Sequence, residues 1–370
     1  MDTKVRYSYL PQQFADAEDL WQSLKEFVKT GDFTLGKPLQ EFEEKFAKLM
    51  GVKYAIGVNS GTDAIKLSLK ALGVGVGDEV ITAANTFVAT VGAICELGAI
   101  PIFVDCDDTF CMNTDLIEEK IGSKTKAIVP VHFTGYMTEM NSLMKIAKKH
   151  NLPVVEDACQ SILGEIDGKK SGTWGDTGAF SLHPLKNLNV WSDGGLIITN
   201  SDKLREQLLL LRNHGLVDRD SVSILGYNSR LDTLQAVVGN WLIPQTESIA
   251  NQRIKNAKYF DENFSKISAV SIPPRPSNYK IVYHLYIIFA EDRDNLLKYC
   301  IDKGIEAKIH YPVPIYRQPA LKYLNHKIGD FPITDGHTKK IISFPCDQHL
   351  SKEEQDYCIK IVQEFYNSKH

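Results

Sequence analysis

Lys186 lies in a tract whose composition is unusual for a surface lysine. The tract "SLHPLKNLNVWSDGG", residues 181–195, follows an apolar run that is typical of a buried strand. Lysine forms Schiff bases with carbonyl compounds, and partial burial lowers its pKa so that the neutral amine is available at physiological pH. The alternative is a lysine that extends along apolar surface to reach water, which is the more frequent case.

The neighbours of Lys186 favour a ligand site. Ser181 and His183 alternate along the expected strand, so their side chains are predicted to face the same ligand. Gly194 and Gly195 carry no side chain, and they allow the backbone to come close to that ligand.

A second stretch, "VNSGTDAI" at residues 58–65, follows an expected strand and opens a helix. Ser60, Gly61 and Thr62 place free backbone N–H groups at the helix N-terminus, where the helix dipole favours negative charge. The Thr62 hydroxyl adds another donor, so the turn suits a phosphate group. The alternative is a plain N-cap in which Thr62 or Asp63 satisfies the helix start.

The third stretch, "LPVVEDACQS", places Asp157 at the carboxyl end of a buried strand. Open α/β sheets bind their ligands at this end of the strands. An unpaired carboxylate there requires a cationic or strongly donating partner, and a protonated pyridine nitrogen would serve. The alternative is a structural aspartate that caps the following loop.

The three features occur together in the form that one cofactor requires. The phosphate of pyridoxal phosphate (PLP) needs hydrogen-bond donors, its pyridine nitrogen needs an anion, and its aldehyde needs an amine. Thr62, Asp157 and Lys186 supply these groups in chain order. Phe87 in "ANTFVAT" is predicted to lie flat on the cofactor ring, and its alternative role is a core aromatic at a helix start.

The elements that must position these residues alternate between short apolar strands and amphipathic helices, which predicts an α/β fold. We expect a mixed, mostly parallel seven-stranded sheet covered by helices on both faces. Its strands are "KYAIGV", "EVITA", "IPIFVD", "KAIVPV", "LPVVED", "GAFSL" and "GLIIT". No helix separates the last two strands, so one of them is expected to run antiparallel.

The pattern changes near residue 250, where a long helix is followed by the alternating strand "IVYHLYIIFA" and ends in a terminal amphipathic helix. We therefore predict a large domain over residues 1–250 and a smaller C-terminal α/β domain over 251–370. The N-terminal residues, to about residue 30, have no clear place in the sheet, and we expect them to pack on the small domain or on the large one.

The composition excludes several classes of protein. The chain has 370 residues, of which 43% are hydrophobic and 24% charged, with a formal net charge of -4, so it carries no electrostatic footprint for nucleic acid. No apolar segment is long enough to cross a membrane, and none resembles a signal peptide, which predicts a cytoplasmic protein. The seven cysteines form no C-x-x-C pair, so we expect free thiols and no metal site.

Several motifs together resemble the DegT/DnrJ/StrS-type sugar aminotransferases. They are "NSGTDAI", "TFVAT", "VPVHFTGYMTEM", "VVEDACQS", "GTWGDTGAFSLHPLKNLNVWSDGG", "LRNHG", "YNSRLDTLQAVVG" and "HYPVPIYRQPA", and they span nearly the whole chain. The resemblance implies a fold-type-I PLP enzyme that works as a homodimer with two active sites at the interface. It also implies amino transfer from L-glutamate to an oxo-sugar, commonly a nucleotide-linked one.

The resemblance assigns roles around the cofactor ring. Lys186 corresponds to the lysine that binds PLP covalently, and Asp157 to the carboxylate that pairs with the pyridine nitrogen. Gln160 and Phe87 bracket the ring. Phe87 stands where many relatives have tryptophan or tyrosine, and Cys159 stands where many have alanine.

The resemblance also assigns the phosphate site. Gly61, Thr62 and Ser181 correspond to residues that hold the phosphate, and Asn228 to a residue that reaches the phosphate in the partner's site. His183 stands where some relatives keep a histidine near the cofactor.

Two other functions fit the same scaffold. A PLP-dependent sugar dehydratase would replace the lysine by histidine or add a cysteine-bound iron–sulfur cluster, whereas this chain keeps Lys186 and has scattered cysteines. A non-catalytic regulator would not need the lysine, Asp157 and the phosphate turn together.

The sugar itself is the least determined part of the function. The tract around "HPLKNLNVW" differs from versions typical of 4-keto-hexose enzymes, and an 8-oxo octulosonate of lipopolysaccharide synthesis is one candidate substrate. Basic and aromatic residues that would contact the sugar or equally serve the structure are Arg212, His214, His310, Tyr311 and Arg317.

Overall fold

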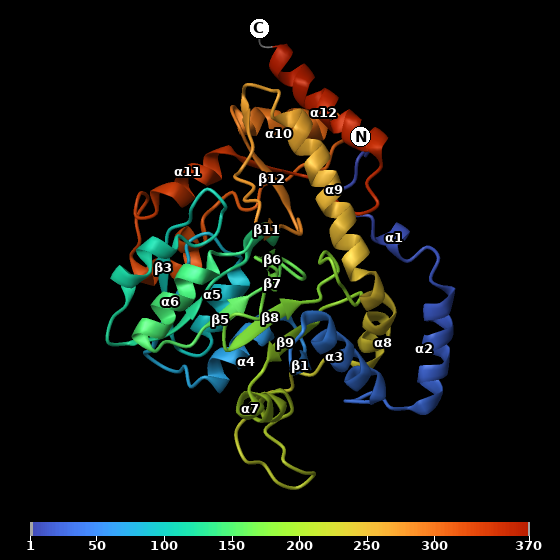
Figure 1. Ribbon diagram of the computed structural model, residues 1–370, viewed down its shortest axis with the longest axis vertical. Coiled ribbons are helices and arrows are strands. Elements are labelled where there is room, and N and C mark those ends of the chain that lie inside the picture. The colour runs from blue at the N-terminus through green and yellow to red at the C-terminus, as the bar shows by residue number, and fades with distance from the viewer. Residues whose placement is uncertain (1–2, 369–370) are drawn as a thin grey trace.

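A seven-stranded sheet forms the centre of the large part of the chain in this computed structural model, which describes residues 3–368 (Figure 1). Its strands are β1 (Tyr54–Val58), β2 (Glu79–Ala83), β3 (Ile100–Val104), β4 (Thr125–Val129), β5 (Val155–Asp157), β8 (Thr177–Ser181) and β9 (Gly195–Thr199). Their order is β3-β2-β4-β5-β8-β9-β1, and two isolated parallel bridges join β4 to β5. Only β9 runs antiparallel to its neighbours among these strands. The seven predicted strands and the antiparallel direction of one of the last two are confirmed.

Helices cover both faces of this sheet because its strands are apolar on both sides. Ile197 of β9 packs with one layer, formed by α4 (Gly61–Ala71), α5 (Val88–Cys95) and α7 (Asp202–Arg212). Its neighbours Leu196 and Ile198 pack with the opposite layer, which includes α3 (Lys37–Met50) and α8 (Thr233–Leu242). Farther along this second face, α6 (Met140–His150) covers the parallel strands.

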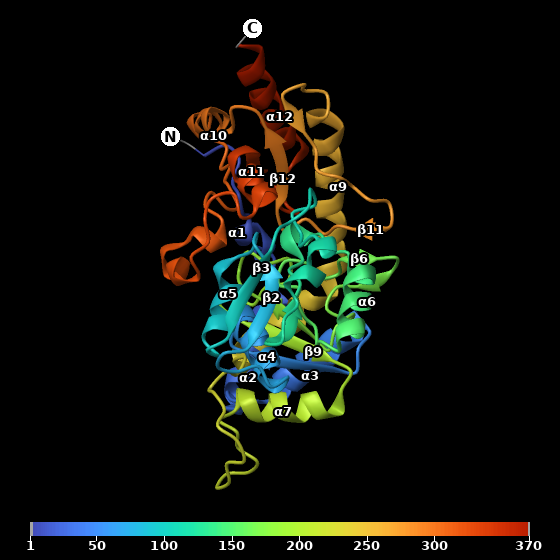
Figure 2. The same cartoon turned by 90° about the vertical axis from the view of Figure 1, so that its left-hand side faces the viewer.

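A smaller antiparallel sheet lies beyond the large one (Figures 1 and 2). It consists of β10 (Val270–Ser271), β12 (Tyr286–Ala290) and β13 (Ile341–Phe344). The helices of this part are α9 (Thr246–Phe264), α10 (Arg293–Asp302), α11 (Pro332–Lys340) and α12 (Lys352–Asn367). The long helix α9 runs from the α8 side of the large sheet to the small sheet, so the predicted boundary near residue 250 falls inside this helix.

The N-terminal segment contacts both parts. Val5 pairs in parallel with Ile305, and the Tyr7 N–H donates to the Glu306 carboxylate at 2.7 Å, so the first described residues extend the small part. By contrast, α2 (Glu18–Thr30) packs on α8 of the large part.

Short elements complete the described chain. The remaining α-helix and strands are α1 (Leu10–Gln13), β6 (Glu165–Ile166), β7 (Lys169–Lys170) and β11 (Tyr279–Lys280). The 3₁₀ helices are Thr114–Leu116, Glu118–Lys120, Phe133–Gly135, Ile243–Gln245, Ile315–Arg317 and Pro319–Leu324. Within residues 3–368, no helix is both long and apolar enough to cross a membrane.

Candidate active site

A cavity of about 340 Å³ opens at the carboxyl ends of the parallel strands, between the large sheet and the small one. Eight of the nine residues predicted for the site line it: Gly61, Thr62, Phe87, Asp157, Gln160, Ser181, His183 and Lys186. The fold thus brings together residues that are more than 120 positions apart in the sequence, as sheet topology of this kind requires.

The N-terminus of α4 forms one end of the cavity. The Ser60 side chain caps the helix by accepting from the Asp63 N–H at 3.1 Å, so neither Thr62 nor Asp63 is the cap. Within the described chain, the N–H groups of Gly61 and Thr62 have no hydrogen-bond acceptor. They face an anion site of the kind that helix N-termini form for phosphate.

Glycines allow the close packing at this end. A Cβ atom on Gly61 would lie 2.8 Å from both the Ser181 Cβ and the Cys159 Sγ, and a Cβ on Gly195 would lie 2.3 Å from the Ser60 carbonyl oxygen. Strand β9 therefore approaches the turn closely, and glycine is required at these two positions.

Asp157 lies at the end of β5 and is buried. Its Oδ2 accepts from the Thr90 hydroxyl at 2.7 Å, and its Oδ1 accepts from the Cys159 N–H at 3.2 Å. The Thr90 hydroxyl also lies 2.7 Å from that of Thr86. None of the residues that the structure describes forms a salt bridge with Asp157. A buried carboxylate of this kind is stabilised by a cationic partner, which a bound ligand would have to supply.

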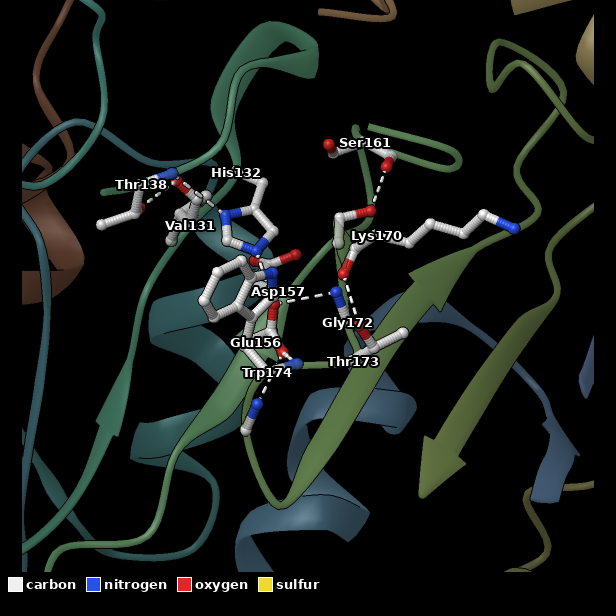
Figure 3. Close-up of polar contacts among 12 residues, drawn as sticks. Val131, His132, Thr138, Glu156, Asp157, Ser161, Lys170, Gly172, Thr173 and Trp174 are labelled. Atoms are coloured by element: carbon white, nitrogen blue, oxygen red, sulfur yellow. Dashed lines mark hydrogen bonds and ion pairs between the residues drawn. The ribbon is translucent and has the colours of Figure 1, made fainter. Parts of the chain in front are cut away.

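A second buried carboxylate, Glu156, directly precedes Asp157 in the chain (Figure 3). Its Oε2 accepts from the Gly172 N–H at 2.8 Å and contacts His132 Nε2 at 2.9 Å. Its Oε1 accepts from the N–H groups of Trp174 and Gly175 at 2.6 and 2.7 Å. Four donors therefore satisfy the buried anion without any cation.

His132 connects this carboxylate to the loop after β4. Its Nδ1 accepts from the Thr138 N–H at 3.2 Å, so the proton of the neutral ring lies on Nε2 and is donated to Glu156. Its own N–H donates to the Asp157 carbonyl at 3.0 Å. The same loop holds Gln160, whose Oε1 accepts from the Thr134 N–H at 2.7 Å. The sequence analysis missed this network; the acidic pair in "VVED" is its only local signal.

Lys186 follows β8 in a tight turn, where its N–H donates to the His183 carbonyl at 2.8 Å. The side chain is half-buried and its Nζ lies 3.4 Å from His284 Nε2. Burial lowers the pKa of the amine, and the nearby Cys159 and Asp157 oppose this shift in part. The site therefore favours the neutral amine that carbonyl chemistry requires.

Aromatic and polar side chains border the space beside Lys186. Phe87 begins α5 but is 48% exposed, so it is not the core aromatic of the alternative interpretation. Its ring centroid lies 5.7 Å from that of Tyr311, at an interplanar angle of 34°. His183 lies at the rim, where burial and the Lys186 charge lower its pKa.

The five residues considered for sugar contact divide into two groups. His310 and Tyr311 line the cavity, and burial lowers the pKa of His310 to about 4. Arg212, His214 and Arg317 do not line it. Arg212 is a structural residue, because its guanidinium is buried, pairs with Glu43 and donates to the Gly57 carbonyl at 3.0 Å.

The cavity also contains residues that the sequence analysis missed: Tyr7, Arg253, His284 and Lys308. Arg253 projects from α9 and its guanidinium donates to the Asp347 carboxylate at 3.2 Å. No local motif identifies these residues, because they come from the N-terminal segment and from the small part of the chain.

Asn228 is the one predicted site residue that lies elsewhere. It is exposed and borders a separate polar pocket of about 180 Å³. The other residues of this pocket are Phe33, Thr34, Leu35, Asn59, Arg230, Leu231 and Asp232.

The described residues include no group of three or more His, Cys, Asp or Glu side chains placed to hold a metal ion. All seven cysteines have free thiols.

Comparison with known proteins places this site in a family. A model of the DegT/DnrJ/EryC1/StrS aminotransferase family matches residues 15–363. A Geobacillus stearothermophilus protein named "pleiotropic regulatory protein" is 37% identical, and the match covers 94% of each chain. A UDP-N-acetyl-3-dehydro-α-D-glucosamine 3-aminotransferase from Acidithiobacillus ferrooxidans is 36% identical, with 95% of each chain covered.

Solved structures agree with this comparison. Streptomyces venezuelae DesV, crystallised in complex with a ketimine intermediate, superposes with a TM-score of 0.95 at 31% identity over 99% of each chain. Other solved members contain the cofactor in its PLP or pyridoxamine phosphate form. The predicted fold type is confirmed by these superpositions.

Proposed function

The chain belongs to the DegT/DnrJ/EryC1/StrS aminotransferase family and is a PLP-dependent enzyme, and we propose that it transfers an amino group from L-glutamate to an oxo-sugar. One observation carries the proposal. A single cavity of about 340 Å³ contains free backbone donors, a buried carboxylate without a cation and an amine of lowered pKa.

These groups fit PLP. The free N–H groups of Gly61 and Thr62, with Ser181 packed against them, would hold the phosphate. The buried Asp157 carboxylate would hold the protonated pyridine nitrogen, and Lys186 would bind the aldehyde carbon. When bound, PLP supplies an electron sink that stabilises negative charge on a substrate carbon that loses its proton.

The side chains of this chain perform the proton chemistry. Once the amino group of glutamate has replaced it on the aldehyde carbon, Lys186 Nζ would be free to remove the proton from the glutamate α-carbon, and its lowered pKa keeps a neutral amine available for that task. The Asp157 carboxylate accepts from the Thr90 hydroxyl and from the Cys159 N–H, and these two contacts orient the group that would pair with the protonated pyridine nitrogen.

The acceptor is a nucleotide-linked keto-deoxyhexose or a less usual oxo-sugar such as an 8-oxo octulosonate. The name of the Acidithiobacillus relative supports a nucleotide-linked sugar, and that relative is similar over 95% of this chain. The sequence tract around Lys186 supports the second candidate.

A regulatory role is the competing proposal, since one similar protein carries a regulatory name. The geometry favours catalysis, because a binding protein has no need for an amine of lowered pKa next to a buried carboxylate.

The test adds L-glutamate to the purified, PLP-loaded protein and follows the visible absorption band of the bound cofactor. We expect the band to disappear as 2-oxoglutarate forms, and a panel of oxo-sugars to restore it. A band that persists at saturating glutamate would support the regulator instead.

We also propose a homodimer in which Asn228 serves the partner's cavity. Asn228 is exposed and lies outside the cavity of its own chain, which supports this arrangement. Mixing Lys186→Ala with Asn228→Ala protein tests it: mixed dimers would regain one intact site, whereas sites built from one chain would regain none.

A further inference from the structure

His284 lies in a short segment, residues 282–285, that crosses the edge of the cavity between β11 and β12. The first N–H of the segment donates to the Gly135 carbonyl at 3.2 Å, and the last donates to the Thr134 carbonyl at 3.1 Å. The Asn187 side chain, next to Lys186, donates to the first carbonyl of the segment at 3.0 Å. The backbone around His284 is therefore held between the loop after β4 and the turn that carries Lys186.

The packing at Gly135 leaves residues 282–285 no room to shift toward the loop after β4. Gly135 has a φ of +105°, and a Cβ on it would lie 2.6 Å from the Tyr283 nitrogen. Only glycine tolerates both conditions, so the loop after β4 holds His284 in place from behind.

The imidazole of His284 has one polar partner among the described residues, and that partner is Lys186. Its Nε2 lies 3.4 Å from Lys186 Nζ, while its Nδ1 is buried without a hydrogen-bond partner. A histidine that serves only the structure usually has both nitrogens paired, as His132 does. His284 is therefore placed for its contact with the amine.

Burial and the charges around the pair determine whether the ring is protonated. Burial lowers the pKa of His284 well below its usual value, and the neighbouring charges of Lys186 and Arg253 lower it further. The ring is thus neutral at pH 7, and the tautomer with its proton on Nδ1 presents Nε2 as an acceptor to the amine. On the other side of the amine, Cys159 and Asp157 raise the pKa of Lys186 against the effect of burial.

We propose that His284 is a positioning residue that accepts a hydrogen bond from Lys186 and directs its amine toward the reacting substrate carbon. The proposal rests on the role of Lys186 in the proposed function. A lysine side chain has four rotatable methylene groups, and one fixed acceptor at its end selects the conformation that reacts. Because the acceptor is uncharged, it orients the amine without repelling its proton.

Two variants separate positioning from packing. His284→Gln keeps an acceptor near the position of Nε2, whereas His284→Phe keeps a ring of similar size and has no acceptor. In the PLP-loaded enzyme we expect the single-turnover rate with L-glutamate to fall by about 10²-fold in His284→Phe and by less than about tenfold in His284→Gln. The glutamate concentration that gives half the maximal rate should change little in either variant.

The pH dependence gives a readout that a packing role would not change. Loss of the acceptor destabilises the protonated amine and lowers the pKa of Lys186. The acid limb, the low-pH side of the plot of single-turnover rate against pH, should therefore move down by about one pH unit in His284→Phe. In His284→Gln the acid limb should lie at the same pH as in the unaltered enzyme. The visible band of the resting enzyme and its melting temperature, measured beside the rates, show whether each variant binds PLP and folds.

His337→Gln is the matched control. His337 is a buried histidine of α11 that contacts Asp108 at 3.3 Å and does not line the cavity. This variant should change the melting temperature and leave the acid limb in place. If His284→Phe fails to bind PLP, the smaller His284→Leu takes the same test.

Equal rates and an unmoved acid limb in His284→Phe, or equal losses in His284→Gln and His284→Phe, would overturn the positioning role. The Lys186→Ala enzyme is measured in parallel. Full activity in that variant would overturn the proposed function itself, so the two failures are distinguishable.

Discussion

The two walls of the cavity differ in how completely their polar groups are satisfied. Behind Asp157, the buried Glu156 carboxylate has four donors, and both nitrogens of His132 are paired. Beside Lys186, the Nδ1 of His284 and the Oδ1 of Asn187 are buried without partners. We call the first, with Glu156 and His132, the scaffold wall, and the second, with Lys186, Asn187, His284 and His310, the reactive wall.

This difference predicts where substitutions change stability and where they change activity. A fully satisfied buried network stabilises one conformation strongly, and breaking it leaves unpaired groups that lower stability. A partly satisfied wall contributes less to stability, because its groups already lack partners in the absence of ligand.

The largest effect is expected at the reactive wall. Lys186→Ala should lower glutamate-driven formation of 2-oxoglutarate at least about 10³-fold, because the other lysine that lines the cavity, Lys308, has its amine 4.3 Å from the centroid of the Tyr7 ring. The melting temperature of the protein without PLP should change little. Turnover within tenfold of the unaltered enzyme would contradict the assignment.

The scaffold wall should respond in the opposite way. Glu156→Gln replaces an acceptor by an amide NH₂ that faces backbone N–H groups, and we expect the free energy of unfolding to fall by about 3 kcal/mol. Denaturant unfolding of the PLP-free protein measures this change. Glu165→Gln is the control, since Glu165 is partly exposed and lies 3.6 Å from Lys280, and its loss should change stability by less than about 1 kcal/mol.

The reactive wall should also make the protein sensitive to acid. The pKa of His310 is about 4 in the folded chain, below the ordinary value of 6.5, so unfolding binds a proton between these values. The stability that neutral His310 contributes is present above pH 6.5 and is lost as the pH falls toward 4, by roughly 3 kcal/mol. His310→Gln should flatten this part of the stability curve, and an unchanged curve would contradict the inference.

The smallest expected effect concerns the phosphate turn. Gly61→Ala places a methyl group 2.8 Å from Ser181 Cβ, so the free N–H groups shift and PLP affinity should fall by about tenfold. Gly92→Ala on α5 is the control, because a Cβ there meets no atom within 4 Å. Equilibrium titration with PLP measures the affinity of each variant. Equal affinities of Gly61→Ala and Gly92→Ala would contradict the prediction, because they would show that the turn accepts the added methyl group.

Much of the fold and part of the site follow from local sequence. Apolar runs identified all seven strands of the large sheet, and the missing helix between the last two strands indicated the antiparallel β9. Lys186, Asp157 and the turn at Gly61 were predicted as site residues because their chemistry depends on a strand end or a helix start, which a short stretch of sequence determines, and the structure places all three at one cavity.

Local sequence failed where a role depends on distant partners. Arg212 was considered for sugar contact, yet its side chain pairs with Glu43 in a separate helix. His284 was not predicted as a site residue, because its neighbours in the sequence form an ordinary alternating strand. Only the packing of the small part against the large sheet brings it to Lys186.

The sequence by itself therefore determined the strands and singled out the turn at Gly61, Asp157 and Lys186 as candidate cofactor residues, since periodicity and turn chemistry act over a few residues. The tertiary structure alone decided which side chains surround the amine: His284 approaches it from 98 positions along the chain. That choice depends on strand order, on the close contact at Gly135 and on burial, which are properties of the packed chain and not of any segment within it.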